Sequence, residues 1–346
     1  MTDENKPLVS IILPVLNEAP HIEQCLRSMM NNTYNPNKVE VLVVDGGSTD
    51  GTRGIVSDIA TQDQRVRLID NPRRILAAGI NIGIENARGE VLIRLDGHAQ
   101  AERDFIERSV EVLQEHPDAW CVGGAITTVN NNYTGRVIAA AMSCGVGVGN
   151  AKFRLGNYEG YADTVAFGAY RKWVFEKVGK FDENLPRTED DDLHFRLHQA
   201  GGKIYISHKI RSIYFSRSNI GKLWRQYFQY GFWRIPTIIK HGQPAAVRQV
   251  VPVVFVLGWL VLIAGALFWE PAKYALAAYA GLYIMVLLIG AILAIRKNGF
   301  VVGVVTPIVF PILHFSYGLG NLAGIWRFVI RRGKGIGKIS DWKITR

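Results

Sequence analysis

The chain has 346 residues, of which 48% are hydrophobic, and its formal net charge is +10. This length allows one large or two ordinary domains. The basic residues form no patterned recognition element for nucleic acid, and many of them flank apolar segments near the C-terminus. We therefore expect an anionic membrane surface as the partner and no nucleic acid.

The cysteines and the start of the chain indicate that the N-terminal part lies in the cytoplasm. The three cysteines are widely spaced and form no Cys-x-x-Cys pair, which argues against a disulfide framework and suits a reducing compartment. Residues 1–7 are polar, and the apolar run that follows is too short for a signal peptide and lacks a basic lead. We expect this part of the chain to stay in the cytoplasm.

The first hundred residues alternate between apolar runs and helical patterns. Runs typical of buried parallel strands occur at Val9–Pro14, Val39–Val44, Val66–Ile69 and Val91–Leu95. Apolar residues recur at helical spacing in Glu18–Met30, Thr52–Ala60 and Ile75–Asn86. This alternation predicts an α/β domain on a mainly parallel sheet, in which ligands bind at the carboxyl ends of the strands. Asp45 and Asp96 both follow such ends, so we expect them to face one crevice.

Two motifs at these strand ends suggest ligand binding. In VLVVDGGSTDGT, the small residues after Asp45 permit close backbone approach to a ligand, and the carboxylate could accept hydrogen bonds from a base N–H or a ribose hydroxyl. The glycine spacing matches neither the dinucleotide fingerprint nor the P-loop. Asp96 and His98 stand two residues apart, and both could bind one divalent cation, with a nucleotide diphosphate completing its ligands. Ordinary turns are the alternative at both places.

Four consecutive acids, Glu189–Asp192, precede an amphipathic helical pattern. Thr188 is expected to cap this helix, with Asp191 as the capping-box acid and Asp192 at the start of the helical face. The helix dipole stabilises the remaining carboxylates, so Glu189 and Asp190 become candidates for acid–base chemistry on rigid secondary structure. A solvated acidic turn is the alternative.

The rest of the chain turns from an irregular region to apolar helices. Residues 121–183 are Gly-rich and are expected to form the acceptor side of the crevice. Aromatic and basic residues then recur at helical spacing from Ile220 to Gly231, which suits an interfacial membrane helix, with a core-packing helix as the alternative. Val250–Trp269 and Ala272–Ile295 are each long enough to span a bilayer, and they form a hairpin that turns at Glu270 and Pro271.

The last apolar segment, Gly299–Trp326, is interrupted by Pro307 and Pro311. It could be a kinked third span or a re-entrant or interfacial element, and the positive-inside rule favours the second. The expected organisation is a catalytic domain at 1–219, an amphipathic interfacial helix region at 220–248, a transmembrane segment of two or three spans at 249–330 and a basic tail at 331–346.

Together the motifs resemble one family. The segments VSIILPVLNE, VLVVDGGSTDGT, AAGINIGIENARGEVLIRLDGHA and FGAYRKWVFEKVGKFDENLPRTEDDDLHFRL are similar, in this order, to those of the family 2 inverting glycosyltransferases. The resemblance covers about residues 7–235 and implies a GT-A fold. The membrane segment after the catalytic domain resembles the arrangement in exopolysaccharide glucosyltransferases of the succinoglycan type.

The resemblance implies a role for each matching residue. The nucleotide-sugar donor would contact the residues at the ends of the first strands and in the stretch after the third, which are Pro14, Asn17, Glu18, Asp45, Ser48, Arg74, Gly79, Asn81 and Asp96. Asp96 and His98 would hold Mn²⁺ or Mg²⁺, although His98 stands where the family has a second acid. Asp190 would be the catalytic base, with Glu189 orienting the acceptor or tuning that base. Gln229 and Trp233 match an acceptor-binding motif in which Phe232 replaces an arginine.

The expected function is transfer of a sugar, with glucose the expected one, from a UDP-sugar to a hydroxyl of a polyprenyl-diphosphate-linked saccharide. The enzyme would be a multi-pass protein of the cytoplasmic membrane, with its catalytic domain in the cytoplasm. A polyprenyl-phosphate sugar synthase is one alternative, but phosphate needs no hydroxyl base. A processive polysaccharide synthase is disfavoured by Phe232. An inactive membrane-tethered scaffold would have no need of Asp45, Asp96 and Asp190.

Overall fold

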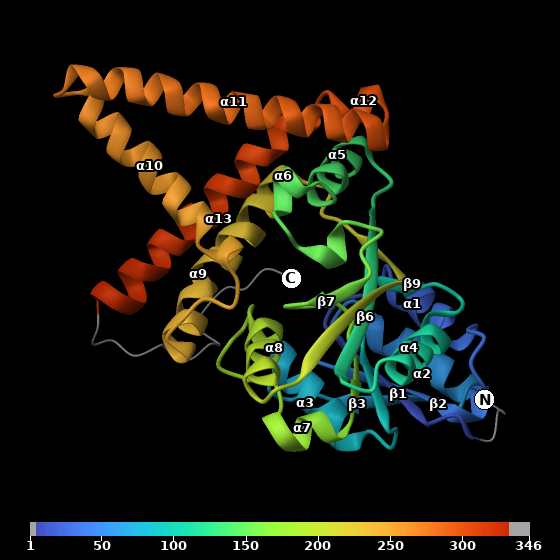
Figure 1. The fold of residues 1–346 in the computed structure, drawn as a ribbon. Helices are drawn as coiled ribbons and strands as arrows, with labels where there is room; N and C mark the ends of the chain where they lie inside the picture. The colour runs from blue at the N-terminus through green and yellow to red at the C-terminus, as the bar shows by residue number, and fades with distance from the viewer. Residues whose placement is uncertain (1–4, 332–346) are drawn as a thin grey trace. The chain divides into compact units, whose positions relative to one another are not determined.

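The computed structural model describes residues 5–331. The chain folds into two compact units: unit 1 is Met1–Thr127 with Gly156–Phe215, and unit 2 is Thr128–Leu155 with Ser216–Arg346. Unit 1 holds the sheet, and unit 2 is helical (Figure 1). Apart from Arg331, the basic tail expected at 331–346 lies outside the described residues.

Unit 1 is built on a sheet whose described strands follow the order β3-β2-β1-β4-β8-β6-β9-β5, with β7 paired to β9. The strands are β1 (Val9–Val15), β2 (Val39–Asp45), β3 (Val66–Asp70), β4 (Val91–Arg94), β5 (Ala99–Ala101), β6 (Ala119–Val129), β7 (Gly160–Ala162), β8 (Ala169–Arg171) and β9 (Lys203–Phe215). The first four are the strands that the sequence predicts, and they pair in parallel.

The parallel half positions the acidic motifs. Every residue of β1 and β2 is buried, as apolar runs covered on both faces require. Val9 pairs with both Val39 and Val91, so β1 lies between β2 and β4 in register. The carboxyl ends of these strands therefore meet at one edge of the sheet, and Asp45 and Asp96 follow that edge.

An antiparallel half extends the sheet beyond β4. Strand β8 pairs antiparallel with both β4 and β6, and the long strand β9 pairs antiparallel with β5 and β7. Much of this half comes from the Gly-rich region that the sequence left irregular. Glycine allows the close packing: a Cβ on Gly124 of β6 would lie 1.6 Å from the carbonyl oxygen of Ile210 in β9.

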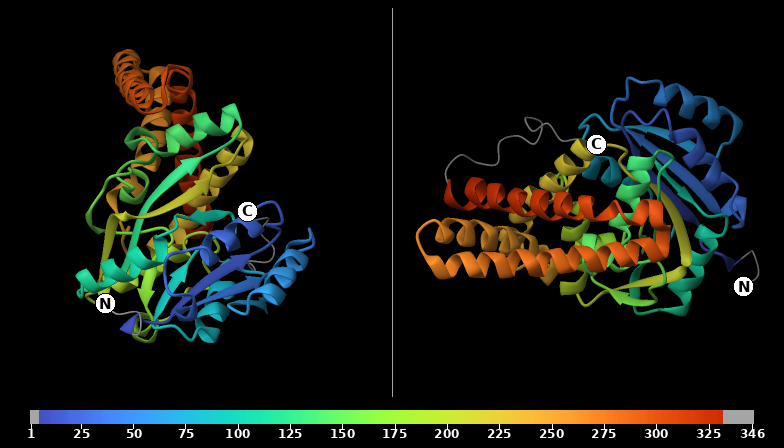
Figure 2. Two further views of the ribbon diagram at one scale, coloured as in Figure 1. Left: turned by 90° about the vertical axis from the view of Figure 1, so that its right-hand side faces the viewer. Right: turned by 90° about the horizontal axis from the view of Figure 1, so that it is seen from above.

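The helices of unit 1 flank the sheet (Figure 2). Where helix α3 crosses β1, a Cβ on Gly83 would lie 2.4 Å from the Cγ2 of Ile12, so glycine is needed for this approach. The helices of unit 1 are α1 (Ile22–Met30), the short 3₁₀ turn η2 (Pro36–Lys38), α2 (Thr52–Gln62), α3 (Leu76–Asn86), α4 (Phe105–Glu115), α7 (Trp173–Val178) and α8 (Glu189–Gln199).

Unit 2 is held together by close helix packing. A Cβ on Gly231 of α9 would lie 2.0 Å from the carbonyl oxygen of Tyr317, and one on Gly320 of α13 would lie 2.1 Å from that of Phe228. Small residues at such crossings let helix backbones approach closely. The helical elements are α5 (Tyr133–Met142), α6 (Gly145–Val148), η3 (Lys152–Arg154), α9 (Ile220–His241), η4 (Val247–Gln249), α10 (Val251–Ala266), α11 (Glu270–Asn298), α12 (Phe300–Gly303), η5 (Thr306–Ile308), α13 (Val309–Ile325) and the π-helical turn η6 (Trp326–Ile330).

Two helical stretches within the described residues are long and apolar enough to cross a membrane: Glu270–Asn298 and the nearly continuous Phe300–Ile330. The expected span at Val250–Trp269 is a helix of only 16 residues. At 1.5 Å per residue it is about 24 Å long, shorter than a hydrocarbon core of about 30 Å. The chain turns after Ala266, and Pro271 sits in the first turn of α11, where a missing N–H costs nothing.

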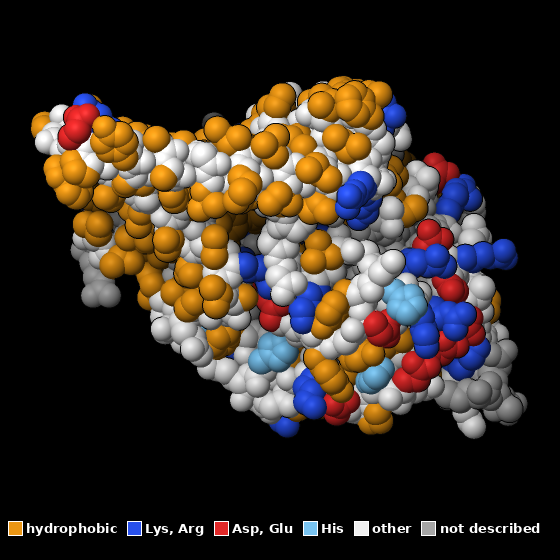
Figure 3. Space-filling model, turned by 45° about the horizontal axis from the view of Figure 1, so that its top comes forward, with side chains coloured by type: hydrophobic (Ala, Val, Ile, Leu, Met, Phe, Trp, Pro, Cys, Tyr) orange, Lys and Arg blue, Asp and Glu red, His pale blue; other side chains and the backbone are white. Residues whose placement is uncertain are grey.

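The apolar helices expose hydrophobic side chains over a broad surface. Within unit 2, such side chains cover α10 and α11 almost without interruption, whereas charged side chains are interspersed over unit 1 (Figure 3). Leu260 of α10 and Leu288 of α11, for example, are 50% and 59% exposed. Apolar surface of this extent marks a membrane or protein interface, and it supports association of unit 2 with a membrane.

Candidate active site

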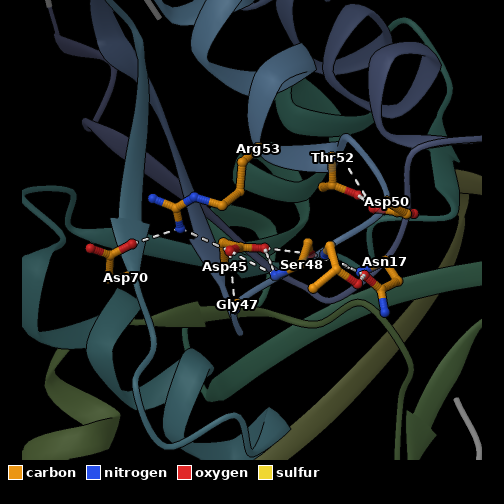
Figure 4. A network of polar contacts seen from close by, with 9 residues as sticks. Asn17, Asp45, Gly47, Ser48, Asp50, Thr52, Arg53 and Asp70 are labelled. Carbon is orange, nitrogen blue, oxygen red and sulfur yellow. Dashed lines mark hydrogen bonds and ion pairs between the residues drawn. The ribbon is translucent and has the colours of Figure 1, made fainter.

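The loop after β2 is organised around the Asp45 carboxylate (Figure 4). This side chain is fully buried and accepts hydrogen bonds from the backbone N–H of Gly47, at 3.0 Å, and from the hydroxyl of Ser48, at 2.5 Å. Arg53 donates to it at 2.9 Å and also bridges to Asp70 at 2.7 Å. Burial alone would raise the pKa of Asp45, but the hydrogen bonds from Ser48 and Arg53 outweigh it and hold that pKa below its usual value.

The loop after β1 is fastened to the loop after β2. The side-chain oxygen of Asn17 accepts a hydrogen bond from the Thr49 N–H at 2.8 Å, and the Asn17 N–H donates to the Ser48 hydroxyl at 2.8 Å. Asn17 has a φ of 56°, a left-handed conformation that asparagine tolerates better than most residues. The Glu18 N–H in turn donates to the Thr52 hydroxyl at 2.9 Å. These motif residues thus fix the shape of the edge at which the donor is expected.

The residues that are expected to cover the donor diphosphate differ in their exposure and in their contacts. Arg74 is exposed and also has a φ of 56°, and its guanidinium lies so near Gly47 that a Cβ there would be 3.1 Å from the Arg74 Nε. A cation beside this turn suits a diphosphate. Gly79 and Pro14 lie in the core, where a Cβ on Gly79 would be 3.3 Å from the Cβ of Pro14, so both shape the packing of α3 on the sheet.

Asn81 connects helix α3 to the segment that precedes α8. Its side chain donates to the Phe181 carbonyl at 2.9 Å and to Glu183 at 3.0 Å, and it accepts from the Phe181 N–H at 2.9 Å. Arg73 holds the same Glu183 carboxylate at 2.6 Å. The structure therefore gives Asn81 a role in holding the segment that leads to α8, while its expected contact with the donor stays a prediction.

The Asp96–His98 pair follows β4, and a second acidic residue, Glu18, lies beside it. The Nδ1 of His98 lies 3.0 Å from a carboxylate oxygen of Glu18, and the Asp96 side chain is 25% exposed. No cluster of three or more His, Cys, Asp or Glu side chains within residues 5–331 is arranged to hold a metal. A carboxylate and an imidazole fit Mn²⁺ chemically, so these two residues could hold the ion if the donor diphosphate supplied further ligands.

Arg94 is the centre of the acidic site. Its side chain is only 10% exposed, and it forms ion pairs with Asp190, with Asp96 at 3.2 Å and with Glu189 at 3.7 Å. Burial would lower the pKa of this guanidinium, but the three carboxylates raise it well above its usual value. One cation thus joins the end of β4 to the start of α8.

The two candidate catalytic acids differ in their surroundings. Glu189 is 4% exposed, and burial together with the neighbouring Asp190 raises its pKa to about 7. Burial also raises the pKa of Asp190, and this effect outweighs the neighbouring Arg94, which lowers that pKa. One oxygen of Asp190 accepts from Arg94, and the other, Oδ1, is buried and has no hydrogen-bond partner among the described residues. Asp190 is therefore fixed at one oxygen and able to accept a hydrogen bond at the other.

The capping of α8 differs from the prediction, and Asp192 forms an ion pair within the helix. Thr188 does occupy the N-cap position of α8, but its side chain makes no capping hydrogen bond, so the predicted capping box is wrong. The φ of −132° and ψ of 22° at Thr188 depart from the extended conformation in which a cap side chain reaches the helix. Asp192 is fully buried and pairs with Arg196 one turn later at 2.8 Å.

The predicted acceptor residues, Gln229 and Trp233, lie on α9 in unit 2. Trp233 is 2% exposed, and its ring lies edge-on to that of Phe232 with centroids 5.4 Å apart and tilted against that of Phe328 at 5.9 Å. Trp233 thus contributes to the core of unit 2, and the acceptor contacts of both residues stay predictions. Sequence reasoning gave no role to Arg53 or Arg94. Each is a cation adjoining a motif acid, a signal that could have marked them.

Comparison with known proteins places this chain in a family. Residues 10–178 match the family described as glycosyl transferase family 2. The succinoglycan biosynthesis protein ExoA of Rhizobium meliloti is 36% identical over 245 residues, which cover 70% of this chain and 73% of that protein. The chain belongs to the family 2 glycosyltransferases. The family that the motifs predict is thereby confirmed.

A second relative of this glycosyltransferase matches along nearly its whole length. It is the dolichyl N-acetyl-alpha-D-glucosaminyl phosphate 3-beta-D-2,3-diacetamido-2,3-dideoxy-beta-D-glucuronosyltransferase of Methanococcus voltae, 28% identical over 92% of this chain and 97% of that protein. The similarity therefore extends beyond the catalytic motifs into the apolar helices.

Solved structures confirm the predicted GT-A fold of this glycosyltransferase. A mannosyltransferase from Pyrobaculum calidifontis, solved with GDP-Man and Mn²⁺, matches with a TM-score of 0.59 at 19% identity, over 92% of this chain and 88% of that one. GalNAc-T7, solved with UDP, GalNAc and Mn²⁺, matches with a TM-score of 0.50 at 18% identity, over 62% of this chain and 44% of that one. At these identities the likeness concerns the fold alone.

Proposed function

We propose that this glycosyltransferase moves a sugar from a UDP-sugar to a hydroxyl of a polyprenyl-diphosphate-linked saccharide, with inversion at the anomeric carbon. Glucose is the proposed sugar, and synthesis of exopolysaccharide or another cell-surface polysaccharide is the proposed setting, as the similarity to ExoA suggests. The observation that carries the proposal is the Asp190 carboxylate, which is anchored by Arg94 at one oxygen and has no partner at the other among the described residues.

The chemistry follows from this arrangement. Asp190 would accept the proton of the acceptor hydroxyl as that oxygen attacks the anomeric carbon, and its raised pKa makes it a stronger base than a solvated aspartate. Glu189 would orient the acceptor or tune that base. A divalent cation held by Asp96 and His98 would supply Lewis-acid stabilisation of the leaving diphosphate. Attack opposite the leaving group converts an α-linked donor into a β-linked product.

The donor would lie along the edge formed by the loops after β1 and β2. Asp45, with Ser48, would recognise the uracil, and Pro14, Asn17 and Glu18 would border the nucleotide, with Gly79 and Asn81 shaping the stretch behind it. Arg74 supports a diphosphate in this place because it brings an exposed cation beside the Gly47 turn.

The acceptor proposal depends on unit 2. Its apolar surface suits a membrane, and the name of the Methanococcus voltae relative gives a saccharide on dolichyl phosphate as its acceptor. Gln229 and Trp233 are proposed to contact the acceptor. The proposed location is the cytoplasmic membrane, crossed more than once, with unit 1 in the cytoplasm.

The test is a transfer assay with purified full-length protein in lipid vesicles. UDP-, GDP- and dTDP-sugars would be offered with Mn²⁺ and a polyprenyl-diphosphate-linked saccharide, and the anomeric configuration of the product would be determined by NMR. We expect transfer from a UDP-sugar and a β-linkage to a sugar hydroxyl. An α-linked product, or transfer to polyprenyl phosphate itself, would overturn the proposal.

A further inference from the structure

Glu18 and His98 form a contact that joins the loop after β1 to the loop after β4. The Glu18 Oε1 and the His98 Nδ1 lie 3.0 Å apart, with 15% and 22% of the two side chains exposed. The Glu18 backbone is held independently, because its N–H donates to the Thr52 hydroxyl at 2.9 Å. The Glu18 side chain is therefore not needed to hold its own loop, and its position toward His98 calls for another explanation.

Gly97, between Asp96 and His98, makes room for this contact. A Cβ on Gly97 would lie 3.1 Å from the Glu18 Cγ and 2.9 Å from the Val15 Cγ1. A larger residue would push the stem of Glu18 away from the imidazole. The His98 ring also lies edge-on to the Tyr214 ring, with centroids 5.6 Å apart, which limits its rotation. The ring is thus oriented from two sides.

We propose that Glu18 is a positioning residue of the metal site, which fixes His98 in the tautomer that presents Nε2 to a divalent cation. This inference rests on the proposed function, in which Asp96 and His98 hold the ion. A neutral imidazole carries one proton, and a carboxylate at Nδ1 places that proton on Nδ1 and leaves the lone pair on Nε2. A carboxylate partner of this kind also strengthens a histidine as a metal ligand.

The number of negative charges near the cation also supports this role of Glu18. A pair of acids after β4 would bring two negative charges to the cation, whereas Asp96 and a neutral His98 bring one. Glu18 restores the second charge one hydrogen bond away from the ion. Glu18 therefore compensates for the neutral ligand without binding the ion itself as a second carboxylate.

The experiment measures binding of Mn²⁺ alone and of Mn²⁺ with UDP to the full chain by electron paramagnetic resonance. The variants are E18A, E18Q and H98A, and the control is E23Q, which removes a charge from an exposed acid on the neighbouring helix α1 that pairs only with Arg27 among the described residues. We expect E18A to weaken Mn²⁺ binding by about 10- to 100-fold, since loss of an outer partner of a metal-bound histidine has that effect. E18Q should weaken it less, because its amide oxygen can still accept from Nδ1–H, and E23Q should not change it.

A second measurement reports the tautomer without any metal. In protein labelled with ¹⁵N-histidine, the His98 signals, assigned by their absence in H98A, should show a proton on Nδ1 in the wild type and a mixed state in E18A. Unchanged Mn²⁺ affinity and an unchanged tautomer in E18A, with weakened binding in H98A, would overturn the role of Glu18 alone. Equal Mn²⁺ binding by wild type and H98A would instead overturn the proposed metal site.

Discussion

Arg94 offers the most demanding test of the site, because one buried guanidinium faces three carboxylates. We consider the substitution R94M, which keeps much of the side-chain volume and removes the charge. In the wild type this side chain is 10% exposed and pairs with Asp190, Asp96 and Glu189. After the substitution the three acids would remain together without their common counter-ion.

The expected loss of folding stability follows from these ion pairs. Removing one partner of a buried ion pair costs about 3–5 kcal/mol, because the other charge is left buried and unpaired. The three pairs share one cation, and Asp96 and Asp190 are 25% and 30% exposed, so solvent screens part of the effect and the lower end applies. For a unit of this size about 3 kcal/mol corresponds to a fall in melting temperature on the order of 10 °C.

The loss of stability in R94M should be larger at high pH than at low pH. The pKa values of Glu189 and Asp190 already lie above their usual range, and loss of Arg94 raises them further. At pH 8 the carboxylates of the folded variant must ionise without a partner, and the full loss of stability relative to wild type is present. As the pH falls through the raised pKa values of these carboxylates, they become protonated in the folded protein. The loss of stability relative to wild type then becomes smaller.

The assay is thermal unfolding of the full chain in detergent at pH 8 and pH 5.5. The matched control is R108M, since Arg108 pairs with Asp104 and Glu111 but is 41% exposed, and such pairs contribute at most about 1 kcal/mol. We expect a large difference between R94M and wild type at pH 8, a smaller one at pH 5.5, and almost none for R108M. A deficit of the same size at both pH values would refute the electrostatic reasoning.

Two further predictions concern the core of unit 1. Burial lowers the pKa of His194 to about 4, from an ordinary value of 6.5, so stability should fall as the pH drops from 6.5 to 4, by about 3 kcal/mol in total. H194Q should unfold with a shallower pH dependence over this range, and an unaltered one would contradict the assignment. G124A should cost about 3 kcal/mol or more, because its Cβ would meet the Ile210 carbonyl oxygen at 1.6 Å. G54A, in the first turn of α2 where a Cβ would meet nothing within 4 Å, should be neutral or slightly stabilising, and equal melting temperatures for the two variants would contradict the packing argument.

The parallel half of the sheet could be predicted because β1 and β2 are buried along their whole length. Val9–Val15 and Val39–Asp45 are continuous apolar runs, and the motif acid at the end of the second follows directly from that pattern. The antiparallel half could not be predicted in the same way. Strand β6 contains Gly123 and Gly124, whose function is to let neighbouring chain segments approach, and glycine in sequence indicates a turn as readily as a tight strand crossing.

The candidate site shows a similar division. Asp45, Asp96 and Asp190 could be selected from the sequence because acids at strand and helix ends follow recognisable patterns. The dependence of Asp96 and Asp190 on Arg94 could not be predicted, because residues 94 and 190 are far apart in the sequence and become neighbours only in the folded chain. The capping box failed for a related reason: the spacing of Thr188 and Asp191 permits a cap, but the backbone angles at Thr188 decide whether it forms.

The apolar C-terminal part shows what composition alone leaves open. Val250–Trp269 has the length and hydropathy of a span, yet the helix ends at Ala266, before the bend that leads into α11. Conversely, Pro307 and Pro311 do not end the last apolar stretch, because Pro307 lies in a 3₁₀ turn at Thr306–Ile308 and Pro311 lies in the first turn of α13, where a missing N–H costs little. Where a helix ends depends on backbone hydrogen bonds and neighbouring helices, which hydropathy does not report.

Asp190 is the proposed catalytic base of the sugar transfer, and the most direct measurement of this role compares D190N with D191N. Both variants replace one acid of the same helical turn by its amide, and asparagine cannot accept the hydroxyl proton. Transfer from the UDP-sugar to the lipid-linked saccharide and binding of UDP with Mn²⁺ would be measured for each. We predict that D190N loses transfer by at least about 100-fold and retains donor binding, while D191N keeps most of the activity. Near-normal transfer by D190N would contradict the account.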